Sequence, residues 1–92
     1  MEKEGNQQIR KFYKKINEID NNLMQLLTER FSIYSKIGEI KRNQEIKVLE
    51  SDHEQQIIDK FSKEYFGALD RKQIKSIFSP IFQISDIAQK RR

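Results

Sequence analysis

The sequence contains no cysteine and only one histidine, His53, in 92 residues. Without thiols the chain cannot form disulfide bonds, use a thiolate nucleophile or hold zinc through sulfur, and this absence is compatible with a reducing cytoplasm. One histidine cannot build a multi-histidine metal site. We therefore expect no metal centre and no cysteine-based catalysis.

Long hydrophobic runs are also absent. No apolar stretch approaches the roughly 18 residues of a membrane span, and the N-terminal MEKEGNQQ lacks the apolar segment of a signal peptide. We therefore expect a cytoplasmic protein that does not bind membranes. The net charge of +4 favours an anionic partner, which could be nucleic acid or a small polyanion.

Proline and glycine, the residues that interrupt helices, are scarce. Residues 7–43 contain no proline and only Gly38 as glycine, which predicts one helix of roughly 37 residues and ~55 Å. Along it runs a stripe with spacings of three and four, which we call the long stripe, and nine of its ten positions are apolar. Its members are Ile9, Phe12, Ile16, Ile19, Leu23, Leu26, Arg30, Ile33, Ile37 and Ile40.

This helix is too long for a small globule. A compact chain of this length has a radius of gyration of only about 12 Å. The long stripe is therefore predicted to be covered by a second copy in a two-fold homodimer. A second apolar row is expected to widen the buried face, and it consists of Met24, Leu27, Phe31 and Tyr34.

Two shorter helices are predicted after a loop at residues 43–50. The capping-box spacing of Ser51 and Glu54 indicates a helix at about 51–65, ended by Gly67. Asp70 is a candidate N-cap for the third helix, which Pro80 should bend. The predicted buried side of that helix is Ile74, Ile77, Phe78, Ile81, Ile84, Ser85 and Ala88. The chain is thus expected to be one all-α domain, 1–92, with frayed ends at 1–6 and 90–92.

Arg30 is the one cation in the long stripe, and Lys41 projects from the same side of the helix. The two are eleven residues apart, about 1,100° of rotation, which returns to within roughly 20° of one direction. A buried unpaired guanidinium is very costly. Arg30 is therefore expected either to pair with a carboxylate, such as Glu29 or Asp20 of a neighbouring chain, or to bind an anionic ligand.

The third helix carries a second polar pair on an apolar face. Ser85 and Gln89 are four residues apart and continue the face of Phe78 and Ile81. Neutral hydrogen-bonding groups on such a face suit a polar ligand held inside a helical bundle.

These features together resemble the all-helical (AroQ) class of chorismate mutases, over residues 9–90. The resemblance rests on four segments in this order: I-x-x-I-D-x-x-L-x-x-L-L-x-E-R (16–30), I-G-E-I-K (37–41), E-S-D-H-E (50–54) and F-x-x-I-F-Q-I-S-D-I-A-Q (78–89). It implies an intertwined homodimer of three-helix chains that rearranges chorismate to prephenate in the shikimate pathway of aromatic amino-acid biosynthesis. The rearrangement is pericyclic and implies no cofactor.

The resemblance also assigns roles to individual residues. Arg30 would bind a substrate carboxylate, and Lys41 would contact the ether oxygen and a carboxylate. Glu54 would accept a hydrogen bond from the ring hydroxyl. Ser85 and Gln89 would contact a carboxylate and the ether oxygen.

The sequence departs from this family at three site positions. Two family arginines are replaced, one by Tyr13 and one by His53, and an aspartate of the acidic turn is replaced by Glu50. Losing a charge-assisted hydrogen bond costs roughly 1.5–3 kcal/mol, or about 10- to 100-fold. The replacements therefore predict a weakened mutase, or an altered one.

Several alternatives stay open at the level of sequence. The substrate could be the 4-amino analogue of chorismate, or isochorismate in a pyruvate-lyase reaction. Glu54 could be only a helix cap. A non-catalytic dimerisation or regulatory module would explain the long stripe. A nucleic-acid binder is disfavoured, because the cations alternate with carboxylates and the aromatic residues lie in the apolar rows.

Overall fold

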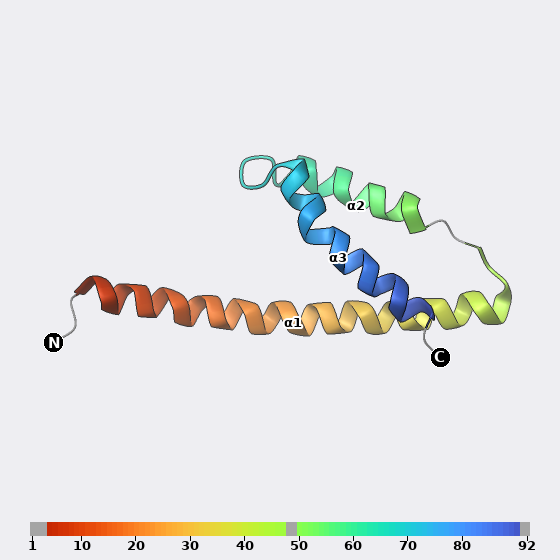
Figure 1. Cartoon of the computed structure of the whole chain (residues 1–92), viewed down its shortest axis with the longest axis horizontal. Coiled ribbons are helices and arrows are strands. Elements are labelled where there is room, and N and C mark those ends of the chain that lie inside the picture. The colour runs from red at the N-terminus through yellow and green to blue at the C-terminus, as the bar shows by residue number, and fades with distance from the viewer. Residues whose placement is uncertain (1–3, 48–49, 91–92) are drawn as a thin grey trace. The chain divides into compact units, whose positions relative to one another are not determined.

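The structure, a computed structural model, describes residues 4–47 and 50–90. Three α-helices follow one another in them, α1 (Glu4–Gln44), α2 (Glu50–Glu64) and α3 (Arg71–Lys90) (Figure 1). No strand occurs in these two ranges, so the predicted all-α class is confirmed. Within them, no helix combines the length and the apolar character that crossing a membrane requires.

The predicted helix boundaries differ from the observed ones by a few residues. α1 begins three residues before the predicted start, and α3 continues to Lys90. α2 begins at Glu50, so Ser51 lies inside its first turn and the predicted start is one residue late. The rest of the predicted frayed ends (1–3 and 91–92) and part of the predicted loop (48–49) lie outside the described residues.

The chain divides into two units, residues 1–30 and 31–92. The first unit is described from Glu4 onward and is the N-terminal part of α1. Its apolar members of the long stripe are all exposed, with Phe12 at 65% and Leu26 at 63%. Met24, which the sequence placed in a buried row, is also exposed, because no other part of the first unit packs against it.

The second unit contains the end of α1, which is closed by a left-handed residue. Glu45 has φ 52°, and the Ile46 N–H donates to the Lys41 carbonyl at 3.1 Å. A bond from the second residue after a helix to a carbonyl of its last turn is the hydrogen bond of the Schellman motif. The left-handed residue of this motif is usually a glycine. The arrangement ends α1 within one turn of Lys41.

α2 and α3 form a hairpin around the core of this unit. The buried core residues are Ile58 on α2 and Ile74 and Phe82 on α3. An aromatic row joins the two helices, with ring centroids 5.4 Å apart for Phe61 and Phe78 and 5.5 Å apart for Phe78 and Phe82. Aromatic pairs at these separations contribute beyond the area they bury. This row of rings packs α3 against α2.

The start of α3 is capped as predicted. The Gln73 N–H donates to Asp70 Oδ1 at 2.7 Å, and the Asp70 N–H donates to Gln73 Oε1 at 2.9 Å. These two bonds form a reciprocal capping box, which satisfies donors that the helix leaves unpaired.

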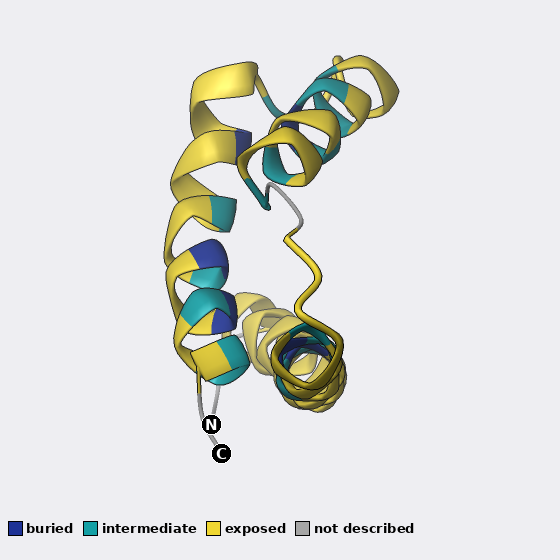
Figure 2. Ribbon diagram, turned by 90° about the vertical axis from the view of Figure 1, so that its right-hand side faces the viewer, coloured by how far each residue is buried: buried dark blue, intermediate teal, exposed yellow. Residues whose placement is uncertain are grey.

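The predicted buried side of α3 needs two corrections. Ile77 and Ile84 are each 47% exposed, whereas Phe82, not predicted, is buried. Buried positions of α3 instead follow one side of the helix through Ile74, Phe82 and Ser85 (Figure 2). The face was misplaced because several apolar residues of α3 fall outside this row, and periodicity alone does not say which row meets α2.

An exposed ion pair links α2 to α3 beside this core. Arg71 Nη2 lies 2.7 Å from Asp59 Oδ1, and Gln55 Nε2 donates to the same oxygen at 3.1 Å. The hydrogen bond from Arg71, followed by that from Gln55, lowers the pKa of Asp59 below its ordinary value of 3.8. A lowered carboxylate pKa stabilises the folded chain above the ordinary value, and this contribution is lost as the pH falls through the lowered value.

Arg71→Gln is therefore expected to destabilise the protein slightly at neutral pH and to reduce the loss of stability in acid. Because the pair is exposed, the fall in Tm should be no more than a few degrees. Thermal unfolding from neutral pH down to about 3 measures both effects. Lys72→Gln, the same charge change at the neighbouring exposed residue, should leave the acid limb of the curve as it is; an equal change there would contradict the prediction.

Candidate functional site

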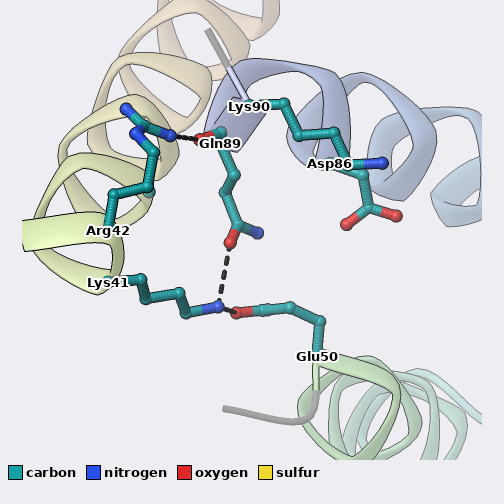
Figure 3. Close-up of a pocket in the computed structure, with 7 residues that line it drawn as sticks. Lys41, Arg42, Glu50, Asp86, Gln89 and Lys90 are labelled. Carbon is teal, nitrogen blue, oxygen red and sulfur yellow. Dashed lines mark hydrogen bonds and ion pairs between the residues drawn. The ribbon is translucent and has the colours of Figure 1, made fainter. Parts of the chain in front are cut away.

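A cavity of about 410 Å³ lies where the end of α1, the start of α2 and the end of α3 meet. Its volume falls within the range of small-molecule sites. Six of its lining residues are labelled in Figure 3. The lining residues are Gly38, Lys41, Arg42, Glu50, Asp86, Gln89 and Lys90.

Lys41 is at the centre of the polar contacts in this cavity. Its Nζ donates to Glu50 Oε1 at 2.5 Å and to Gln89 Oε1 at 2.9 Å, as the dashed lines in Figure 3 show. The side chains of Lys41 and Glu50 are only 18% and 20% exposed. The ammonium therefore joins all three helices while being largely shielded from solvent.

These contacts leave hydrogen-bond donors for a ligand. An ammonium has three N–H donors, and the two contacts use two of them. Lys41 only donates, so its partner in the Gln89 amide must be the oxygen. The Gln89 Nε2 group therefore keeps its own N–H donors for another partner. The cavity thus offers two neighbouring kinds of donor, one cationic and one neutral, suited to an oxygen that gains negative charge.

The backbones of α1 and α3 approach closely beside these side chains. A Cβ atom added to Gly38 would lie 1.9 Å from the carbonyl oxygen of Gln89 and 2.6 Å from its Cα. Arg42 Nη1 donates to the same carbonyl oxygen. The end of α3 is therefore held against one face of α1.

Of the residues predicted to form the site, Lys41, Glu50 and Gln89 are brought together. Ser85 is buried one turn before Gln89, at 3% exposure, and its Oγ donates to the Ile81 carbonyl at 2.8 Å. In this arrangement that hydroxyl proton is directed to its own helix.

The two other predicted site residues on α2, Glu54 and His53, are not among the residues that line this cavity. Glu54 is half-buried and lines a second hollow of about 240 Å³ between α2 and α3, together with Lys75 and Ser79. His53 is exposed.

Arg30 and Tyr13 belong to the first unit. Arg30 is half-buried there, and Tyr13 is exposed at 62%. Their participation in a site with Lys41 stays a prediction.

Four lining residues were not predicted as site residues: Gly38, Arg42, Asp86 and Lys90. Gly38 could have been identified from the sequence, because it is the only glycine within the long predicted helix. Arg42 and Asp86 directly follow the predicted residues Lys41 and Ser85, but they fall off the apolar rows on which the sequence reasoning relied.

Comparison with known protein families matches residues 12–90 to the family described as chorismate mutase type II. The matched segment contains every residue that lines the cavity. No significant match was found among the curated proteins or the solved structures.

Proposed function

The chain belongs to the chorismate mutase type II family, and on this premise we propose that it converts chorismate to prephenate in the cavity around Lys41. The observation that carries the proposal is the joint contact of Lys41 with Glu50 and Gln89, which leaves donors on both Lys41 and Gln89 available to a ligand. We place the reaction in aromatic amino-acid biosynthesis in the cytoplasm.

The reaction needs only positioning and charge stabilisation. In this rearrangement the C–O bond of the enolpyruvyl ether breaks while a C–C bond forms in the same molecule, and no proton or electron is exchanged with the protein. Negative charge grows on the ether oxygen as the bond breaks. Lys41 and Gln89 would donate to that oxygen, and donors arranged in advance in a shielded site stabilise such charge most effectively.

The remaining family roles are part of the same proposal. Arg30 would hold a carboxylate through its planar fork of donors. Glu54 would accept from the ring hydroxyl, and Ser85 would contact a carboxylate. We propose that the site is completed in a homodimer.

A substrate that bears an ammonium group is the second candidate, and the carboxylates of the cavity lining support it. Glu50 and Asp86 place two carboxylates on its lining, next to the cations Lys41, Arg42 and Lys90. A carboxylate attracts an ammonium more strongly than it attracts a hydroxyl. The 4-amino analogue of chorismate therefore fits this lining, and Glu54 would suit its ammonium as well.

Incubation of the purified protein with chorismate, isochorismate and 4-amino-4-deoxychorismate, followed by identification of the products, tests both candidates. We expect slow conversion of chorismate to prephenate with weak substrate affinity, because Tyr13 and His53 stand where the family has arginines. Turnover of the amino compound alone would support the second candidate. Pyruvate released from isochorismate alone would indicate the lyase reaction.

The double substitution Tyr13→Arg with His53→Arg is expected to raise kcat/KM for chorismate at least about tenfold, since each restored charge-assisted hydrogen bond is worth about 10- to 100-fold. Steady-state kinetics measure the gain, which should appear mainly as a lower KM. Arginines placed at the exposed positions Asn21 and Gln56 serve as a control for added charge. No turnover of any of the three substrates by either the double variant or the wild type would leave only a binding or dimerisation module.

A further inference from the structure

We infer that Arg42 and Gly38 are positioning residues that set the direction of the Gln89 amide, a role that rests on the proposed function of the cavity. Both residues line the cavity, and the role inferred for them acts through Gln89 and not through a contact with the substrate. Both act on the backbone of Gln89, and through it on the donor that Gln89 presents.

Gln89 is held at two points by consecutive residues of α1. Lys41 donates to its side-chain oxygen at 2.9 Å, and Arg42 donates to its backbone oxygen. The first contact fixes which end of the amide faces the cavity. The second contact fixes the position of the Gln89 backbone, from which the side chain extends. Loss of either would leave the amide free to rotate or to shift.

The end of α3 needs this support. Gln89 is the second-last residue of α3, and the last carbonyls of a helix have no partner within it. Helix ends fray for this reason, and a cation beside them satisfies the carbonyls and complements the helix dipole. Arg42 supplies such a cation to Gln89 from another helix.

Gly38 makes the contact sterically possible. It lies one turn before Arg42 on α1, and a Cβ at this position would overlap the Gln89 backbone. A glycine inside a helix weakens it, and here the absence of a side chain lets the end of α3 come close to α1. Any side chain at this position would move Gln89 away from Lys41.

Arg42→Gln is expected to lower kcat for chorismate by about 3- to 10-fold with little change in KM, because an exposed charge-assisted contact is lost but no substrate contact is. Arg42→Lys should recover part of the loss. In a Gln89→Leu background the same Arg42→Gln change should have no further effect. Lys36→Gln, an equal change of charge at an exposed position of α1, is the control. An equal loss of kcat with and without the Gln89 amide would overturn the inference.

A second measurement does not depend on turnover. In two-dimensional ¹⁵N NMR spectra, the side-chain amide signals of Gln89 should shift towards those of a free glutamine in Arg42→Gln, and backbone hydrogen exchange should accelerate at the end of α3. Gly38→Ala should shift the same signals. If Gly38→Ala does not fold, the test rests on Arg42→Gln alone. Unchanged Gln89 signals in Arg42→Gln would overturn the inference even in an active enzyme. A chain that turns over no substrate but shows the shift would refute the proposed function and leave the positioning role intact.

Discussion

Replacement of Lys41 by methionine is expected to lower kcat for chorismate by about 100- to 1,000-fold, the usual effect of removing one preorganised donor to a developing negative charge. Lys41 contacts both Glu50 and Gln89 in this cavity. The variant loses the cationic donor and also the contact that orients the Gln89 amide. Single-turnover assays on chorismate would separate this loss of chemistry from a loss of binding.

The stability of Lys41→Met provides the first check. Glu50 would lose its cation in a largely shielded position, so some destabilisation is expected. The double variant Lys41→Met with Glu50→Gln removes both charges, and it should recover stability without recovering activity. Lys47→Met, at an exposed position just after α1, is the matched control for loss of a lysine. A Lys41→Met enzyme within tenfold of the wild-type kcat would contradict the proposed role.

Leu23→Asp is expected to raise the Kd of the proposed homodimer by about 100- to 10,000-fold. The N-terminal members of the long stripe are exposed, and Leu23 is 50% exposed. Burying a leucine contributes about 1.5–3 kcal/mol, and a two-fold dimer buries it twice, which gives roughly 3–6 kcal/mol. Sedimentation equilibrium should show the wild type near twice 11.1 kDa, and the variant as a monomer that has lost helix content.

Asn21→Asp is the control for Leu23→Asp, because it places the same side chain two residues earlier, on the opposite side of α1, at an exposed position. Its dimer should form as in the wild type. A stable, fully helical monomer of the wild type at micromolar concentration would contradict the dimer. Equal dissociation of both variants would show that added charge, and not the apolar stripe, is responsible.

The sequence by itself determined the helices and one of their caps. Spacings of three and four, with no proline in residues 7–43, were enough to predict α1, because helical periodicity is a property of local sequence. Asp70 and Gln73 form the cap of α3 through contacts three residues apart, which the sequence also shows. The four segments that resemble the family predicted a match over residues 9–90, and the family match covers residues 12–90.

Only the tertiary structure decided which faces of the helices meet. Ile77, Ile84 and Phe82 are all apolar, and their burial depends on where α3 crosses α2, which periodicity does not encode. Lys41 and Gln89 are 48 residues apart, so their contact exists only because the hairpin returns α3 to the end of α1. The contacts of Arg42 and Gly38 with the Gln89 backbone have the same origin. Backbone contacts between distant segments carry no periodic signature, and their detection requires the folded chain.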